Sequence, residues 1–201
     1  MALVVITDSG VVNDEWDTIK DLFEAGLTRL HIRKPEWDLR QLETWLEGID
    51  ESYHPYLAVH GSGSFGERHA LGGLHLKGNQ PVEGYLKWKG RLSKSFHEWS
   101  ELDEKVNERL DYAFISPVFD SLSKVNYPAR WSEKELKMNL KKRALPFRLL
   151  ALGGVCLETL NLAKSWGFDG AAILGSVWKY DNRKDRVNAF KEMVKTWQEV
   201  Y

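Results

Sequence analysis

The sequence lacks several features that would place the chain in a specialised class of protein. One cysteine in 201 residues excludes an internal disulfide framework and a cysteine-rich zinc site. The charges nearly cancel, with 28 basic and 29 acidic residues, so no basic excess points to nucleic acid or to a membrane surface. No run approaches the roughly 20 apolar residues of a membrane span, and no basic segment precedes the first apolar run. We therefore expect a cytoplasmic protein that binds neither nucleic acid nor membranes.

Low-complexity tracts and linkers rich in proline or glycine are also missing, so nothing in the sequence marks a domain boundary. A chain of this length can bury a core of its own, and we expect residues 1–201 to form one domain. Tryptophan is unusually frequent, with nine copies. Several fall on predicted helix faces, where they can cover the core or fill a subunit interface, which leaves a homodimer open.

Short apolar runs alternate with amphipathic stretches along the chain. The runs predict eight strands, at residues 2–7, 29–33, 56–60, 73–76, 92–96, 112–116, 148–152 and 170–174. Strands alternating with helices favour a parallel sheet with right-handed crossovers. One predicted helix, at 132–144, begins with the capping-box pattern of Ser132 and Glu135.

Eight such strands predict an α/β fold, a compact single-domain (β/α)8 TIM barrel. The segments after the third and fourth strands are too short for full helices, so we expect abbreviated helices there. An open doubly wound sheet is the alternative. It is less favoured because the turn at Asp8-Ser9-Gly10 lacks the glycine pattern of a dinucleotide-binding loop.

Active sites of such barrels lie at the C-terminal ends of the strands. Cations and hydroxyls gather at these predicted ends and carboxylates are nearly absent, which predicts a site for an anion such as phosphate. The residues concerned are Thr7, Asp8, His31, Arg33, Lys34, His60, His75, Lys77, Ser95, His97, Ser116, Ser121, Ser123 and Lys124.

Glycines follow the last two predicted strands, as Gly153-Gly154 and Gly175-Ser176. Barrels commonly bind phosphate there through backbone N–H groups, and the absence of a Cβ lets the backbone approach the oxygens. The alternative is that these glycines only turn the chain.

His97 follows the fifth predicted strand and is a candidate general acid or base, or else a histidine at the start of the next helix. Three further histidines, His31, His60 and His75, stand in or at the ends of strands. They show no HxH or HxxxH spacing and no assisting carboxylate, so we expect no metal site. Arg33 and Lys34 also have an alternative interpretation, as a solvated strand end.

Several blocks occur in the order in which one known family carries them. They are His31-Ile32-Arg33-Lys34-Pro35, Gly73-Leu74-His75-Leu76, Leu92 to His97, Ser116-Pro117-Val118-Phe119, Ser121-Leu122-Ser123-Lys124, Ala151-Leu152-Gly153-Gly154-Val155 and Gly167 to Ala172. On these blocks the chain resembles, over nearly its full length, thiamine phosphate synthase and its relative, the TenI-type thiazole tautomerase.

The resemblance implies a barrel that acts on a thiazole phosphate in thiamine biosynthesis. The synthase joins hydroxymethylpyrimidine pyrophosphate to thiazole phosphate and releases pyrophosphate, with Mg²⁺ on the diphosphate. Carried over by position, the thiazole phosphate would lie on Gly154, Gly175 and Ser176, and the pyrimidine near Ser95. The pyrophosphate would lie on Arg33, Ser121, Ser123 and Lys124.

The chain departs from the synthase pattern where that enzyme binds Mg²⁺. The Asn-Asp pair after the third strand is replaced by His60-Gly61, and the second metal aspartate falls within residues 77–80, which contain no carboxylate. His97, in contrast, aligns with the proton-shuttling histidine of the tautomerase. We therefore expect a tautomerase-like enzyme with His97 as acid and base and no required cofactor.

Two alternatives remain open. The first is a thiamine phosphate synthase, to which Mg²⁺ would belong, or in which Arg33, Lys34, His60 and Lys77 neutralise the pyrophosphate directly. The second is a protein that binds thiazole or thiamine phosphate without turning it over.

Overall fold

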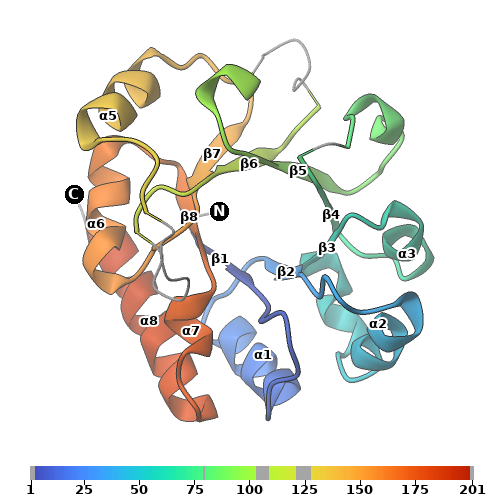
Figure 1. Ribbon diagram of the computed structural model, residues 1–201. Helices are drawn as coiled ribbons and strands as arrows, with labels where there is room; N and C mark the ends of the chain where they lie inside the picture. The colour runs from blue at the N-terminus through green and yellow to red at the C-terminus, as the bar shows by residue number, and fades with distance from the viewer. Residues whose placement is uncertain (1–2, 79, 103–108, 121–127, 200–201) are drawn as a thin grey trace.

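A computed structural model describes residues 3–78, 80–102, 109–120 and 128–199 of the chain. Eight parallel strands close into a barrel in chain order, β1 beside β8, as Figure 1 shows in a view along the barrel. The TIM-barrel prediction is confirmed. The strands are β1 (Leu3–Ile6), β2 (Leu30–Ile32), β3 (Leu57–His60), β4 (Gly73–Leu76), β5 (Arg91–Phe96), β6 (Tyr112–Ile115), β7 (Arg148–Ala151) and β8 (Gly170–Ile173).

Helices surround the barrel, and those after β3 and β4 are short, as expected. The α-helices are α1 (Glu15–Glu24), α2 (Leu39–Leu46), α3 (Gly63–Arg68), α5 (Glu133–Lys142), α6 (Leu157–Trp166), α7 (Gly175–Trp178) and α8 (Arg183–Glu199). Three 3₁₀ segments join them: η1 (Glu51–Tyr56), η2 (Glu83–Tyr85) and η3 (Trp99–Glu101).

The predicted capping box opens α5. The Ser132 hydroxyl accepts the Glu135 N–H, and the Glu135 carboxylate accepts the Ser132 N–H. The helix expected after β5 is described only as far as η3, because residues 103–108 lie outside the described residues. No helix among the described residues has the length and apolar composition needed to cross a membrane.

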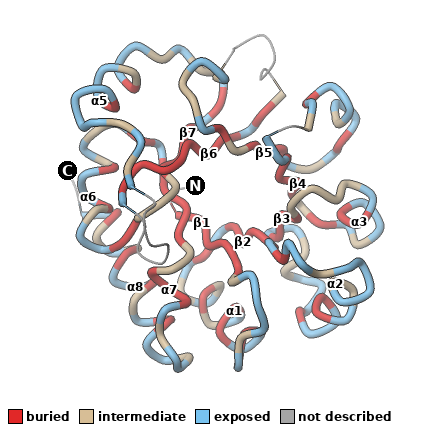
Figure 2. The backbone as a smooth tube through the Cα atoms, viewed as in Figure 1, coloured by how far each residue is buried: buried red, intermediate tan, exposed pale blue. Residues whose placement is uncertain are grey.

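The hydrophobic core has two parts. The larger part fills the space between strands and helices, where Ile19, Leu22 and Phe190 are almost fully buried. A smaller cluster inside the barrel contains Val4 and Leu150 with neighbours from β1, β6, β7 and β8. Figure 2 shows the buried strands inside a ring of helices that expose their outer faces.

The barrel interior is polar along the remaining strands. Register pairs His60 of β3 with His75 of β4, His75 with Ser93 of β5, and Ser93 with Tyr112 of β6. Paired residues on neighbouring strands point to the same side of a sheet, so these four share the interior side. This half of the barrel positions the candidate site.

The tightest turn at the N-terminal end of the barrel gives a test of the fold. A Cβ at Gly72 would lie 1.8 Å from the Pro55 carbonyl oxygen, whereas at Gly84 nothing lies within 4 Å. We expect Gly72→Ala to lower the free energy of unfolding by about 1–3 kcal/mol more than Gly84→Ala does. Urea unfolding of the two variants measures the difference, and equal stabilities would contradict this packing.

Candidate active site

A hydrogen-bonded network of histidines lies in the polar half of the barrel. His31 Nδ1 is 3.0 Å from His60 Nε2, and His31 Nε2 is 2.7 Å from the Tyr112 hydroxyl. His75 contacts two hydroxyls at 2.8 Å, Ser93 through Nδ1 and Ser95 through Nε2. Tyr112 is also hydrogen-bonded to the Ser93 side chain, so the network runs from the fully buried Tyr112 up to the half-buried His60 and Ser95 at the C-terminal end of the barrel.

Burial keeps these imidazoles neutral. Removal from water lowers the pKa of His75 to about 3, with a further contribution from the Arg33 charge. The same burial lowers the pKa of His31 and of His60 well below the usual value. Burial also raises the pKa of Tyr112 to about 12. Each neutral ring donates from one nitrogen and accepts on the other. A proton can therefore pass along the network only if each ring in turn exchanges its donor and acceptor nitrogens.

The three histidines also form a cluster that has to be tested as a metal site. One nitrogen from each of His31, His60 and His75 lies within 4.8 Å of the others. The rings of His60 and His75 are 4.2 Å apart at their centroids and only 31° from parallel, so their in-plane lone pairs do not converge on one point. Both nitrogens of His75 already contact serine hydroxyls. The geometry is that of a hydrogen-bonded network, and the expected absence of a metal stays a prediction.

Two cations stand above the network at the C-terminal mouth. Arg33 follows β2 and Lys77 follows β4, and both side chains are exposed. Both charges contribute to lowering the pKa of His60. The Lys77 side chain lies across Gly61: a Cβ at Gly61 would be 2.8 Å from Lys77 Cε and 3.6 Å from Lys77 Nζ.

This arrangement does not fit Mg²⁺. Mg²⁺ requires oxygen ligands, usually carboxylates with retained water. The positions that carry aspartates in the synthase pattern hold here a glycine and a segment that begins with Lys77, whose ammonium group lies over that glycine. We derive no step through Mg²⁺ at this position.

Lys34 does not belong to the mouth, which corrects the sequence-based prediction. Its ammonium is buried and lies 2.9 Å from both carboxylate oxygens of Glu15, in α1, and 2.6 Å from the Gly10 carbonyl. Trp45 Nε1 donates to the same carboxylate at 2.9 Å. Side chains alternate between the two sides of a strand, so where Arg33 continues the interior side of β2, Lys34 turns outward to α1.

The glycine loops lie where the phosphate site was predicted, after β7 and β8. Gly153 and Gly154 have φ of 92° and 63°, and a Cβ at Gly154 would be 2.2 Å from the Asp120 carbonyl oxygen. Gly175 begins α7, where the first N–H groups have no partner within the helix. The Ser176 hydroxyl is buried and donates to the Val155 carbonyl, which ties α7 to the β7 loop. Any contribution of Ser176 to an anion is therefore through its backbone.

His97 is exposed at the end of β5. Its Nδ1 lies 3.1 Å from the Ser116 carbonyl oxygen, which can only accept. Nδ1 also lies 3.3 Å from the Ser116 hydroxyl, which can accept as well as donate, so the carbonyl decides: in the neutral ring Nδ1 carries the proton and Nε2 is left as the basic atom. This orientation suits a general base at the mouth.

Four of the predicted substrate-binding residues remain. Ser95 lies at the top of the network, as described. Ser121, Ser123 and Lys124 lie outside the described residues. Two tryptophans follow strands at this end of the chain's fold, Trp37 after β2 and Trp178 after β8: Trp178 is buried and donates to the Ile6 carbonyl at 2.7 Å, whereas Trp37 is half-buried with the Lys34 ammonium 4.7 Å from its ring.

Sequence reasoning missed three residues that shape this region: Ser93, Tyr112 and Glu15. A signal existed for the first two, because Ser93 and Tyr112 stand two residues from Ser95 and Phe114 and therefore share their side of the strand. Glu15 carried no signal, since it belongs to a helix and only the folded barrel brings it to Lys34.

The buried pair of Lys34 and Glu15 makes a prediction about stability. Removing one partner of a buried ion pair leaves an uncompensated charge, so we expect Lys34→Met to cost about 3 kcal/mol of unfolding free energy. The double variant Glu15→Gln/Lys34→Met should recover most of it, because the amide still accepts from Trp45. Urea unfolding measures both.

An exposed ion pair provides the control for this experiment. Arg68 and Glu43 are 2.6 Å apart at the surface, so Arg68→Met should cost less than about 1 kcal/mol. Equal losses in Lys34→Met and Arg68→Met would contradict the buried role of Lys34.

The lowered pKa of His75 makes a prediction about pH. Between pH 6.5 and pH 3, His75 binds a proton in the unfolded chain but not in the folded protein. The free energy of unfolding therefore falls as pH falls below 6.5. At pH 5.5 this group alone should cost about 1 kcal/mol relative to pH 8. Urea unfolding of wild type and His75→Gln at both values tests this, since the variant should lose less on acidification. An unchanged pH dependence in the variant would be the contrary result.

Comparison with known proteins gives one consistent family. The sequence model described as thiamine monophosphate synthase matches residues 3–177. A thiamine-phosphate synthase of Vibrio parahaemolyticus is 24% identical over 181 residues, covering 82% of this chain and 83% of that protein. These names favour the synthase over the tautomerase that the sequence analysis preferred.

Solved structures agree. A thiamine phosphate pyrophosphorylase from Bacteroides thetaiotaomicron superimposes with a TM-score of 0.83 and 30% identity, covering 100% of both chains. A thiamine phosphate pyrophosphorylase from Pyrococcus furiosus gives a TM-score of 0.81 at 19% identity, over 98% of this chain and 96% of that one, which bears on the fold alone. The chain belongs to the thiamine monophosphate synthase family, a family of thiamine-biosynthesis enzymes.

Proposed function

We propose that the C-terminal mouth joins a hydroxymethylpyrimidine pyrophosphate to a thiazole phosphate, with fixed cations of the protein in place of Mg²⁺. The observation that carries this proposal is the Lys77 ammonium over Gly61, on the same side of the barrel as Arg33 and within a chain of the synthase family. The possible substrates are thus a phosphorylated thiazole and a pyrimidine pyrophosphate.

The reaction breaks the bond between the pyrimidine methylene carbon and the pyrophosphate oxygen. The electron pair leaves with pyrophosphate, and the thiazole nitrogen supplies the pair for the new carbon–nitrogen bond. Negative charge therefore grows on the leaving group, where preorganised cations stabilise the transition state. Arg33 and Lys77 are the described cations at the mouth that lie near His60 and have no carboxylate partner among the described residues.

The neutral network below has a different role in this proposal. Neutral imidazoles next to Arg33 and Lys77 leave the positive charge of the mouth on these two side chains, where the proposed reaction needs it to stabilise the departing pyrophosphate. Ser95 presents a hydroxyl, already oriented by His75, to the pyrimidine side. The thiazole phosphate is assigned to the backbone of Gly154 and Gly175.

The test is product formation from the two precursors, followed by chromatography, with EDTA or with Mg²⁺. We expect thiamine phosphate in both conditions at the same rate, and Lys77→Gln should lower kcat/KM by about 100-fold because a leaving-group donor is lost. Lys134→Gln, an exposed lysine of α5, is the matched control and should not change the rate. Strict dependence on Mg²⁺, or an unimpaired Lys77→Gln enzyme, would refute the role given to Lys77.

Thiazole tautomerisation is the second candidate, because the Ser116 carbonyl leaves Nε2 of His97 as the basic atom at the mouth. In that case the thiazole is isomerised without the pyrimidine substrate, and His97→Asn abolishes the isomerisation. If neither reaction occurs and calorimetry shows thiazole phosphate binding, the protein is a binder. Each activity thus has its own readout.

A further inference from the structure

The end of the barrel opposite the C-terminal mouth carries a cavity. A cavity of about 990 Å³ opens among residues that precede or begin successive strands, from Arg29 before β2 to Arg148 at the start of β7. Cavities that hold small ligands commonly measure about 300–1,000 Å³. The site is separate from the C-terminal mouth, because its residues lie at the N-terminal ends of the same strands.

The charge around this cavity is one-sided. Five of its lining residues are cations, namely Arg29, Lys89, Arg91, Arg109 and Arg148, and Asp111 is the single carboxylate in the lining. Asp111 is already engaged, since Oδ2 accepts the Leu92 N–H at 2.8 Å and lies 3.5 Å from Arg109 Nη1. Arg109 also donates to the Trp88 carbonyl at 2.8 Å.

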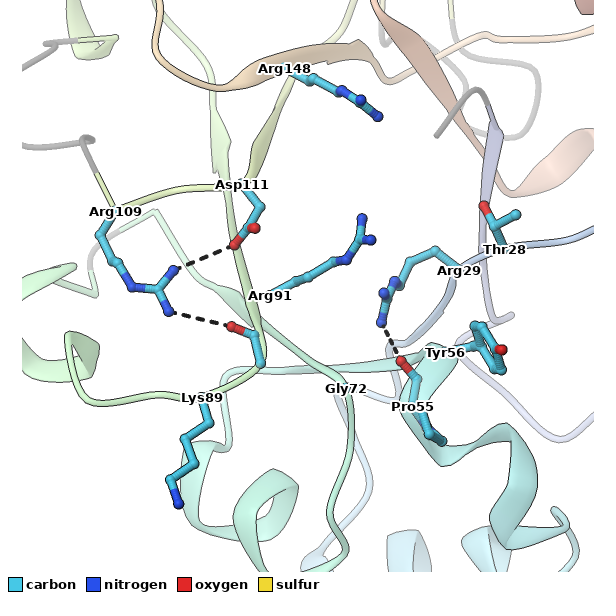
Figure 3. A pocket seen from close by; sticks show the side chains of 11 residues that line it. Thr28, Arg29, Pro55, Tyr56, Gly72, Lys89, Arg91, Arg109, Asp111 and Arg148 are labelled. Atoms are coloured by element: carbon cyan, nitrogen blue, oxygen red, sulfur yellow. Dashed lines mark hydrogen bonds and ion pairs between the residues drawn. The ribbon is translucent and has the colours of Figure 1, made fainter.

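Three arginines remain directed into the same space. Figure 3 shows Arg29, Arg91 and Arg148 reaching in from different sides, with Lys89 pointing away. The register explains this: Arg91 pairs with Gly73 and Arg148 pairs with Tyr112, so both continue the interior side of the barrel. No ion-pair partner is found for these three guanidinium groups within the described part of the chain.

Arg29 is the buried arginine of this cavity. It is only 4% exposed, and among the described residues its side chain makes one hydrogen bond, from Nη1 to the Pro55 carbonyl at 3.0 Å. Its Nε is buried and finds no hydrogen-bond partner among the described residues. Burial and then the nearby Arg91 charge lower the pKa of this guanidinium. A buried cation without a counter-charge is costly, and a bound anion removes that cost.

We propose that this N-terminal cavity, formed around Arg29, Arg91 and Arg148, binds a small oligophosphate, with two or more linked phosphate groups. The planar fork of a guanidinium matches phosphate oxygens in a bidentate way, and three forks exceed what a single phosphate needs. Pro55 and the half-exposed ring of Tyr56 form an apolar edge beside the arginines, which suits a flat ring attached to the phosphates.

The experiment is calorimetric titration of the full chain with inorganic pyrophosphate at low ionic strength. Pyrophosphate is also the product of the proposed reaction, so the titration uses Arg33→Gln/Lys77→Gln as the background, in which the C-terminal mouth is weakened. In this background we expect one equivalent of pyrophosphate to bind. Adding Arg91→Gln/Arg148→Gln should weaken that binding by about tenfold or more, because two charge-assisted contacts are lost.

Two controls separate charge from geometry and from folding. Arg40→Gln in the same background removes an exposed arginine of α2 and should leave binding unchanged. Arg91→Lys/Arg148→Lys keeps both charges but loses both forks, and should bind with intermediate affinity. Because both arginines are exposed strand-initial residues, circular dichroism of each variant should match that of the background protein.

The outcomes are distinct. No binding of pyrophosphate in the Arg33→Gln/Lys77→Gln background, or equal binding after Arg91→Gln/Arg148→Gln, overturns the N-terminal site and leaves the proposed reaction untouched. A parallel titration with ADP identifies the kind of ligand. Tighter binding of ADP that Tyr56→Ala abolishes indicates a ring against Tyr56, and equal binding indicates recognition of the phosphates alone.

Discussion

The burial of the His31 imidazole is the constraint on which the barrel interior depends. A fully buried ring must bond through both nitrogens or lose the free energy of two hydrogen bonds, and here it lies between His60 and Tyr112. These partners come from β3 and β6, so one ring links opposite sides of the barrel. Because burial, and after it the nearby Arg29 charge, favours the neutral form of His31, the network stays uncharged. The barrel therefore has a neutral polar middle, flanked on one side by the apolar cluster of Val4 and Leu150.

Positive charge lies at both ends of this neutral middle. On β2 the interior positions are Arg29 below, His31 in the centre and Arg33 above, and the same alternation places Arg91, Ser93 and Ser95 along β5. The overall charge of -1 conceals the pattern, since the acidic residues lie mostly on the helices and loops outside. The two proposed anion sites at opposite ends would operate independently, because a layer of uncharged, hydrogen-bonded rings separates them.

The fold could be predicted from the sequence because eight short strand-like runs, most of them apolar, alternate with amphipathic stretches. The position of Arg33, Ser95 and His97 at the C-terminal end followed from the fold. The partner of Lys34 did not, because Glu15 reaches it from a helix distant in sequence. The N-terminal arginines were overlooked for a different reason. Arg29 and Arg148 are the first residues of two predicted strands, and nothing in the sequence indicates that they meet. They face one cavity only because the strands close into a barrel with this register.

At the C-terminal mouth, the glycine at position 61 and the lysine at position 77 have to be considered together. An aspartate at position 61 facing Lys77 would neutralise the ammonium and leave no charge for a pyrophosphate. A glycine there without Lys77 would leave the mouth with Arg33 alone beside His60. With Gly61 at φ 74° and the Lys77 side chain across it, the ammonium lies over bare backbone and has no carboxylate partner among the described residues. In the synthase pattern a carboxylate-bound cation would supply a positive charge at this edge of the barrel. In the proposed reaction the Lys77 side chain would supply that charge.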